Sequence, residues 1–305
     1  MLAYRPLTAS ASRQDGKDRQ IAVIRLTREG DKWEIVAETR GYGVYLDNFA
    51  IIDFAKGCPS QRRRFVSALR DRGTLLFSWA NAVEIAGPQG GSADAARAFL
   101  NSIGPHWIPL ESNAWEVARK ENAGRATDSA VSEHFMRTFF QERVAELLSE
   151  GGPGPDLPSE SFFELGTVLD WVQADRDKVR TYREQLDDAL RGRLDWLRAE
   201  YDRDMASLDR LLPPCEFDPN RLGNFVLVHL QRMLVQEAKS YSFAPHDGLD
   251  FCHAVMAAAY GSVIALDKAW KRRVEALPHA DQLARTYYRP ELDQLVGLLE
   301  SRSLS

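Results

Sequence analysis

The fold is decided by residues 41–78, which read GYGVYLDNFAIIDFAKGCPSQRRRFVSALRDRGTLLFS. A short apolar run leads to Asp47, and a second compact apolar run occupies residues 74–78. Between the two runs apolar residues recur at helical spacing, and Pro59 and Gly73 mark the ends of a helix. Strand, helix and strand in this order predict an α/β fold with a parallel sheet.

Helical periodicity then dominates residues 111–245. The longest apolar stripe runs from Val179 to Leu212 in steps of three and four residues. This stripe predicts one long helix, suited to be an arm of an antiparallel helical hairpin. Asp218 and Pro219 provide a cap and a first-turn proline for a further helix.

The α/β pattern returns after residue 245, with a small-residue helix at 247–260, a buried strand at 262–266 and a helix at 268–276. Near the N-terminus, two β-rich runs within residues 20–39 flank a turn that contains Gly30, which predicts a β-hairpin. The predicted organisation is an N-terminal hairpin extension (1–40), an α/β core (41–110 and 246–305) and a mainly α-helical insertion (111–245).

The composition excludes several classes of protein. Hydrophobic residues make up 44% of the 305 residues, which excludes global disorder. The net charge of −5 argues against a protein that coats nucleic acid, because such a chain is strongly basic. The cysteines (Cys58, Cys215 and Cys252) are odd in number and fit a reducing cytoplasm. We find no signal peptide in residues 1–18 and no apolar run of about 20 residues for a membrane helix.

Acidic side chains stand at the ends of the predicted strands or on adjoining helices. Asp47 and Asp267 directly follow apolar strands, Asp250 opens the small-residue helix, and Glu84 lies on the helix after residues 74–78. The carboxyl ends of parallel strands form the ligand crevice of an open sheet, so these acids are expected to converge. Converging carboxylates repel one another, and a hard cation such as Mg²⁺ or Mn²⁺ removes the repulsion. The pattern therefore predicts an acidic metal site.

A purely structural alternative applies to the same acids. Acidic residues number 44 among 305, and an Asp that follows a strand is often only the N-cap of the next helix.

Short motifs around these acids stand in a set order: VYLDN at 44–48, SWANAVEI at 78–85, DGLDFCHA at 247–254 and VIALDK at 263–268. They resemble the motifs of the PIN family of nucleases, in a bacterial subgroup with an Asp-x-x-His third motif. The resemblance implies a parallel sheet flanked by helices, with Asp47, Glu84 and Asp250 as metal ligands, directly or through water. Asp267 would complete the pocket or bind a second ion. The implied reaction is hydrolysis of a phosphodiester to a 5′-phosphate and a 3′-hydroxyl, usually in single-stranded or structured RNA.

Neighbouring polar residues have supporting roles in this interpretation. Asn48 and Ser78 would orient the acids through hydrogen bonds, and His253 would bind a carboxylate or contact substrate. Capping and ordinary polar packing are the alternatives for each. Two basic clusters near the acids are candidates for contact with nucleic acid, and a solvated helix face is the alternative: Arg62, Arg63, Arg64, Lys268, Lys271 and Arg272.

We therefore predict a Mg²⁺- or Mn²⁺-dependent endoribonuclease, either the toxin of a toxin–antitoxin pair or a defence nuclease. A DNA nuclease on the same core is one alternative. The other is a catalytically silent scaffold that binds protein or RNA through the insertion. The expected partners are an RNA substrate, an antitoxin or another protein, and a second copy of the chain, with no membrane.

Overall fold

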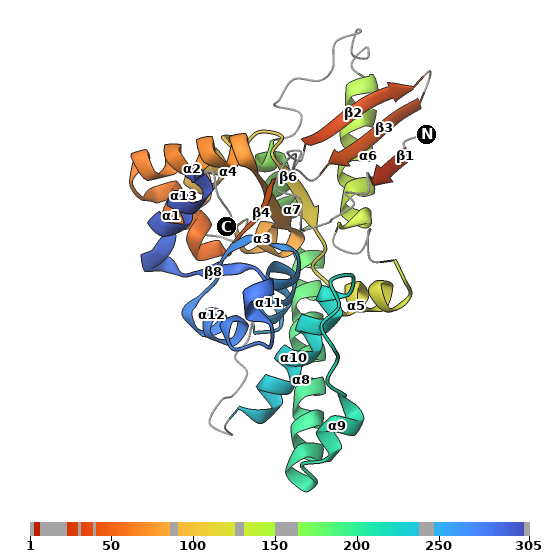
Figure 1. Cartoon of the computed structure of the whole chain (residues 1–305). Helices are drawn as coiled ribbons and strands as arrows, with labels where there is room; N and C mark the ends of the chain where they lie inside the picture. The colour runs from red at the N-terminus through yellow and green to blue at the C-terminus, as the bar shows by residue number, and fades with distance from the viewer. Residues whose placement is uncertain are drawn as a thin grey trace.

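A computed structural model of the chain describes residues 3–6, 23–29, 32–38, 41–85, 91–125, 131–149, 164–237 and 247–301. Its centre is a five-stranded sheet with the strand order β6-β5-β4-β7-β8 (Figure 1). Every neighbouring pair in this sheet is parallel. The strands are β4 (Tyr42–Leu46), β5 (Gly73–Ser78), β6 (Trp107–Leu110), β7 (Val263–Ala265) and β8 (Arg285–Tyr287). The predicted α/β class, a parallel sheet flanked by helices, is confirmed, and it agrees with a PIN-like arrangement.

The central strands are buried along almost their whole length because helices cover both faces of the sheet. All of β5 and β7, and the last four residues of β4, are buried, as is usual for parallel sheets. The helices of the α/β part are α1 (Asn48–Lys56), α2 (Pro59–Arg72), α3 (Trp79–Ile85), α4 (Gly91–Asn101), α11 (Asp247–Tyr260), α12 (Lys268–Glu275) and α13 (Leu292–Glu300), with short 3-10 turns at Ala280–Gln282 and Arg289–Glu291.

The predicted N-terminal hairpin is present. Strands β2 (Val23–Glu29) and β3 (Lys32–Glu38) pair antiparallel, and Gly30 of the predicted turn lies outside the described residues. A further strand, β1 (Ala3–Pro6), pairs parallel with β3, so this second sheet has the order β1-β3-β2. The sequence pattern did not predict β1.

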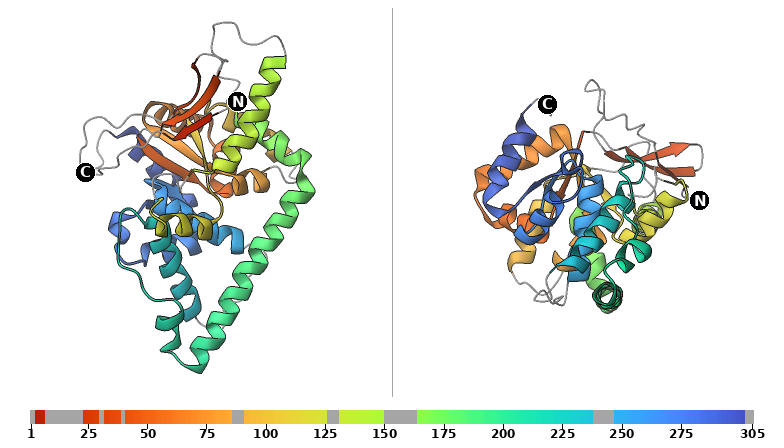
Figure 2. Two further views of the ribbon diagram at one scale, coloured as in Figure 1. Left: turned by 90° about the vertical axis from the view of Figure 1, so that its right-hand side faces the viewer. Right: turned by 60° about the horizontal axis from the view of Figure 1, so that its bottom comes forward.

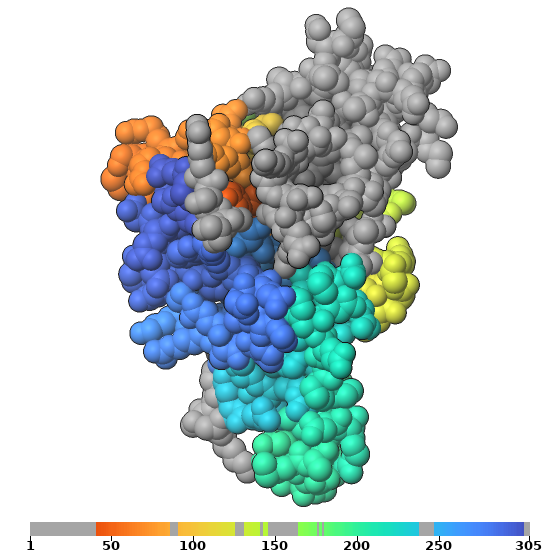
Figure 3. All heavy atoms as spheres, viewed as in Figure 1, coloured from red at the N-terminus to blue at the C-terminus, as the bar shows by residue number. Residues whose placement is uncertain are grey.

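Helices fill the described part of the segment between β6 and α11: α5 (Ala114–Asn122), α6 (Glu133–Ser149), α7 (Leu165–Ala174), α8 (Arg176–Arg203), α9 (Ser207–Leu211) and α10 (Leu222–Gln236). Helix α8 runs away from the sheet and α10 returns beside it (Figure 2), so that α8, α9 and α10 form one end of the molecule (Figure 3). Their buried apolar residues, apart from Leu186, belong to the same apolar cluster as the sheet. The domain boundaries drawn from the sequence stay a prediction.

Two expectations about these helices are wrong. The predicted single helix from Val179 to Leu212 is broken, because α8 ends at Arg203 and Asp204 adopts extended backbone angles. The Asp204 carboxylate accepts the backbone N–H of Ala206, a local bond that competes with helix continuation. Similarly, Asp218 accepts the N–H of Asn220 in a turn, and the next helix begins only at Leu222.

Among the described residues, no helix combines the length and the apolar character that crossing a membrane requires.

Candidate metal centre

The ends of β4 and β7 place two of the predicted acids side by side. Leu46 and Ala265 are partners in the parallel pairing, and the N–H of Asp47 donates to the backbone oxygen of Ala265 at 3.0 Å. Asp267 follows two residues after Ala265. Strand β4 has β5 on one side and β7 on the other. From β4 the chain leads to β5 on one side of the sheet and later to β7 on the other, so the order of the strands reverses at β4. Open α/β sheets form their ligand crevice at such a point.

Helices α3 and α11 bring further ligands to the same point. Glu84 lies on α3, directly after β5, and His253 lies on α11, directly before β7. One ligand atom from each of Asp47, Glu84 and His253 lies within 4.8 Å of the other two. The sequence predicted His253 only as a supporting residue, and the structure places its ring among the atoms that could hold a cation. We call Asp47, Glu84 and His253 the acidic triad.

Asp250 and Asp267 flank this acidic triad. Asp250 lies one helical turn before His253 on α11 and is half-buried, and its negative charge acts on Glu84. Asp267 is exposed, and its Oδ1 accepts the backbone N–H of Trp270 at 2.8 Å. The structure therefore brings all four predicted carboxylates into one region, with Asp267 at its outer edge.

The structural alternative also holds for the two strand-end residues. Asp47 is the N-cap of α1 and accepts the N–H of Asn48 at 2.7 Å, and Asp267 is the N-cap of α12. The backbone N–H of Asp267 also acts on the Asp47 carboxylate. A carboxylate has about four lone-pair sites, so these contacts leave sites for a cation. Capping and metal binding are therefore compatible at both positions.

Burial makes the negative charges of this region unfavourable. It raises the pKa of Glu84 to about 8, with further increases from the charges of Asp47 and Asp250. Burial likewise raises the pKa of Asp250 to about 7 and that of Asp47 to about 6, and neighbouring carboxylates add to both. Arg183 of α8 partly offsets the effect at Glu84 and Asp250. A site that disfavours its own negative charge favours a bound cation.

His253 is held neutral. Its side chain is 3% exposed, and burial lowers its pKa to about 3, with a smaller contribution from Arg183. Its Nε2 lies 3.4 Å from the Ser78 hydroxyl, and its ring meets the edge of Tyr45 with centroids 5.7 Å apart. A neutral imidazole fixed in this way presents a nitrogen lone pair.

A buried hydrogen-bond network lies beneath the acidic triad, with Asn81 at its centre. The Asn81 Oδ1 accepts both the backbone N–H and the hydroxyl of Ser78, each at 2.9 Å. Its Nδ2 donates to the Tyr45 hydroxyl and to the backbone oxygen of Leu46, each at 3.2 Å. Sequence reasoning ranked Ser78 above Asn81 for such a supporting role, and the structure places Asn81 at the centre of the network. The signal available was a pair of polar residues three positions apart in an otherwise apolar stretch.

Several buried polar atoms at the site have no hydrogen-bond partner among the described residues. They are Oε2 of Glu84, Nδ1 of His253 and Oδ1 of Asn48. Leaving such atoms unsatisfied costs free energy, so their presence in a converging acidic cluster fits a bound ion with its waters. Mg²⁺ and Mn²⁺ both bind carboxylate oxygens. An imidazole nitrogen is a better ligand for Mn²⁺ or a softer metal than for Mg²⁺.

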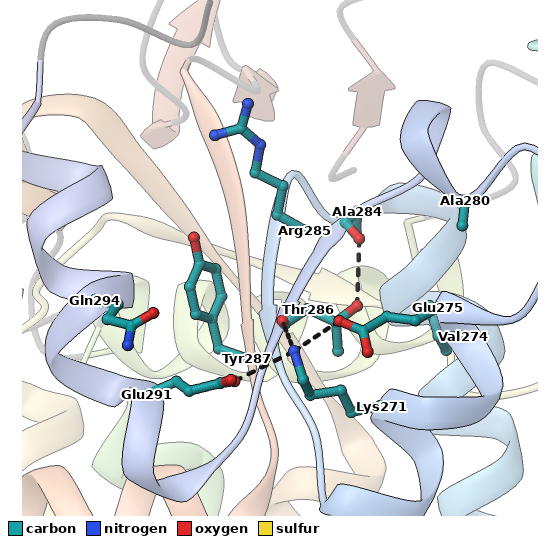
Figure 4. A pocket seen from close by; sticks show the side chains of 10 residues that line it. All are labelled: Lys271, Val274, Glu275, Ala280, Ala284, Arg285, Thr286, Tyr287, Glu291 and Gln294. Atoms are coloured by element: carbon teal, nitrogen blue, oxygen red, sulfur yellow. Dashed lines mark hydrogen bonds and ion pairs between the residues drawn. The ribbon is translucent and has the colours of Figure 1, made fainter.

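The predicted basic contacts divide into two groups. Arg62, Arg64 and Lys271 are bound within the chain: Arg62 to the backbone oxygen of Ala55, Arg64 to Asp293 and Glu300, and Lys271 to Glu275, Glu291 and the backbone oxygen of Thr286. The Lys271 contacts line a pocket of about 310 Å³ beside β8, which does not include the acidic triad (Figure 4). The other three, Arg63, Lys268 and Arg272, are exposed. A role in nucleic-acid binding stays a prediction for all six.

Comparisons of the chain with protein-family models, with curated proteins and with solved structures give no match. The geometry of the site and the motif resemblance are therefore the two observations from which a function can be inferred.

Proposed function

We propose that this chain is a metal-dependent nuclease of the PIN type that hydrolyses phosphodiester bonds of RNA with Mg²⁺ or Mn²⁺. One observation carries the proposal: Asp47, Glu84 and His253 converge within 4.8 Å at the point of the sheet where chain order reverses. The raised pKa values of Asp47 and Glu84, and the unpartnered Oε2 of Glu84, support a cation there.

The residues have distinct roles in this proposal. Asp47 and Glu84 hold the ion, and Asp250, which lies outside the acidic triad, reaches it through water. His253 holds the carboxylates in place or provides a nitrogen ligand, fixed by its contact with Ser78. Asp267 completes the outer edge. A hard divalent ion at this position would activate a water molecule and stabilise charge on a phosphate oxygen. The expected products carry a 5′-phosphate and a 3′-hydroxyl.

The test combines metal binding with cleavage. Calorimetric titration with Mn²⁺ should show binding to the wild-type protein and none to a variant that combines Asp47→Asn with Glu84→Gln. End-labelled single-stranded RNA and single-stranded DNA of the same sequence should then be offered with Mn²⁺. Cleavage of RNA in preference to DNA supports the proposal, and preferential cleavage of DNA replaces it with the DNA-nuclease alternative.

A wild-type protein that neither binds Mn²⁺ nor cleaves either strand would leave the scaffold alternative. In that case Asp47→Asn with Asp250→Asn would leave the cellular phenotype unchanged.

The proposal extends to the setting of the reaction. We place it in the cytoplasm, as expected from the cysteines, where the chain would act as a toxin or as a defence nuclease. Its partners would be an antitoxin-like protein or a second copy of the chain.

A further inference from the structure

We infer that Arg183 of helix α8 holds an oxygen of the substrate phosphate at the acidic triad, so that the helical insertion completes the active site. This inference rests on the proposed function and names a residue that the motif resemblance does not include.

Close packing fixes α8 against the elements that carry the site. Leu186 of α8 forms a small buried cluster with Ala80 of α3 and Leu249 of α11, and Tyr182 packs against the same cluster. Ala80 lies four positions before Glu84 on α3, and Leu249 directly precedes Asp250 on α11. The face of α8 that contains these residues therefore lies against the two helices that provide the acids.

A backbone contact sets the distance between α8 and α11. The carboxylate of Asp187 accepts the N–H of Gly248 at 2.9 Å. A Cβ atom at Gly248 would lie only 2.7 Å from the Cα of Asp187, so only glycine allows this approach. Asp250 lies two residues after Gly248, which places its helical turn directly beside this part of α8.

Arg183 lies one turn before Leu186 and Asp187, and so on the same side of α8. It is half-buried, and its Nε is buried without a hydrogen-bond partner among the described residues. Its positive charge acts on Glu84, Asp250 and His253. A guanidinium whose Nε lacks a partner, beside a cluster that a cation would neutralise, has N–H groups suited to a phosphate oxygen.

The chemistry explains why the arginine and the cation would act together. Without an ion, the Arg183 charge only partly offsets the carboxylates. A bound ion would neutralise the carboxylates in place of the Arg183 guanidinium. The N–H groups of the guanidinium would then be available to an anionic phosphate. The RNA strand would then lie between the carboxylates of the α/β core and Arg183 of the insertion.

Binding of RNA to Arg183 variants tests this inference. A labelled single-stranded RNA is titrated with wild type, Arg183→Ala, Arg183→Lys and Arg180→Ala in Ca²⁺, after a gel has shown that the RNA stays uncut. Arg180 is the matched control, since it lies one turn away on α8 and is exposed, with Asp177 and Glu184 as its ion-pair partners. We expect Arg183→Ala to weaken RNA binding roughly 10- to 100-fold, the range for a lost charge-assisted bond.

Two further readouts separate this role from a structural one. The slope of log affinity against log salt should fall by about 0.7 for Arg183→Ala, which is the value for one lost phosphate contact on a single strand. Mn²⁺ affinity should stay equal or increase, because a competing cation is removed. Arg183→Lys keeps a positive charge at the site and should show intermediate RNA affinity. Partly retained binding by this variant would show that the loss in Arg183→Ala does not come from misfolding.

The outcomes distinguish the two proposals. If wild type binds Mn²⁺ and cleaves RNA while Arg183→Ala binds RNA like Arg180→Ala, the role of Arg183 is rejected and the proposed function stands. If wild type binds no Mn²⁺ and cleaves nothing, both are rejected.

Discussion

The two sides of the candidate site are positioned by different means. On the sheet side, backbone pairing places Asp47, because β4 and β7 are in parallel register and its own N–H bonds to Ala265. On the α8 side, side-chain packing and one glycine contact place Arg183, through Leu186 and Gly248. Strand register is held by the repeated backbone pairing of β4 and β7, whereas the docking of α8 depends on a few individual side-chain and glycine contacts. Substitution of a strand-end ligand should therefore reduce RNA cleavage with little loss of stability. Substitutions at the α8 contact should reduce both cleavage and stability.

The largest effect is expected for Asp47→Asn. Loss of a direct ligand should reduce cleavage by more than the roughly 10- to 100-fold that is typical when an outer partner of a metal ligand is removed. The melting temperature should change little, since Asn caps a helix about as well as Asp. Steady-state cleavage assays and thermal melts measure the two effects. Asp71→Asn, an exposed aspartate of α2, is the control and should retain wild-type activity. Wild-type cleavage by Asp47→Asn would exclude this residue as a ligand.

Asn81→Ala tests the network beneath the acidic triad. The buried N–H of Ser78 and the hydroxyl of Tyr45 would both lose a partner. We expect the free energy of unfolding to fall by about 2–4 kcal/mol, because each unsatisfied buried group costs about 1–3 kcal/mol. Urea denaturation measures the change. Asn122→Ala removes an exposed bond to Asn224 and should cost less than about 0.5 kcal/mol. Equal effects of the two variants would show that Asn81 is not the centre of the network.

Gly248→Ala tests the contact between the two sides. The added methyl group would clash with the backbone of α8 at Asp187, so we expect destabilisation by about 1–3 kcal/mol, as for overpacked sites, and reduced RNA cleavage. The matched control is Gly192→Ala on α8, where a Cβ meets nothing within 4 Å. That change should stabilise the protein by up to about 1 kcal/mol through helix propensity. Chemical denaturation of both variants checks the opposite signs, and a neutral Gly248→Ala would mean that α8 does not approach α11 this closely.

An effect of similar size concerns pH in the metal-free protein. The folded pKa values of Glu84 and Asp250 are raised to about 8 and about 7, so their contribution to stability is complete only at low pH and is lost as pH rises through these values. His253 has the opposite sign, because its pKa is lowered to about 3, and its contribution is complete above its ordinary value near pH 6.5. Between pH 6.5 and 8 the carboxylates therefore dominate.

Over this pH range the free energy of unfolding in EDTA should fall by about 2 kcal/mol from Glu84 alone, at about 1.4 kcal/mol per pH unit. Melts at a series of pH values, with EDTA and with Mn²⁺, measure the effect. Mn²⁺ should stabilise the protein more at pH 8 than at pH 6.5, and Glu84→Gln should flatten the metal-free profile. A metal-free stability that rises across this range would contradict the assignment.

Much of the sheet side was predictable because its signals are local. Apolar runs that end in an acid predicted β4, β7 and the positions of Asp47 and Asp267, and helical spacing predicted α11 with the bounds that the structure has, Asp247–Tyr260. Strand β6 was missed because its four residues include Pro109, which usually indicates a strand break. It is tolerated here because β6 is an edge strand, where a missing N–H costs no ladder bond.

The rest depends on contacts that no local pattern encodes. His253 could have been considered as a ligand from its position one turn after Asp250, but its neutral state follows from burial that only the fold provides. Arg183 is one of several arginines on α8. Periodicity shows that a face of this helix is buried, and it does not show that the face meets α3 and α11.

The capping role of Asp47 has a consequence for the evolution of this sequence. One nucleotide exchange converts an aspartate codon into an asparagine codon, and the amide would still cap α1 as the carboxylate does. A descendant could therefore lose the proposed catalysis without losing its fold, and keep helix α8 for a new role.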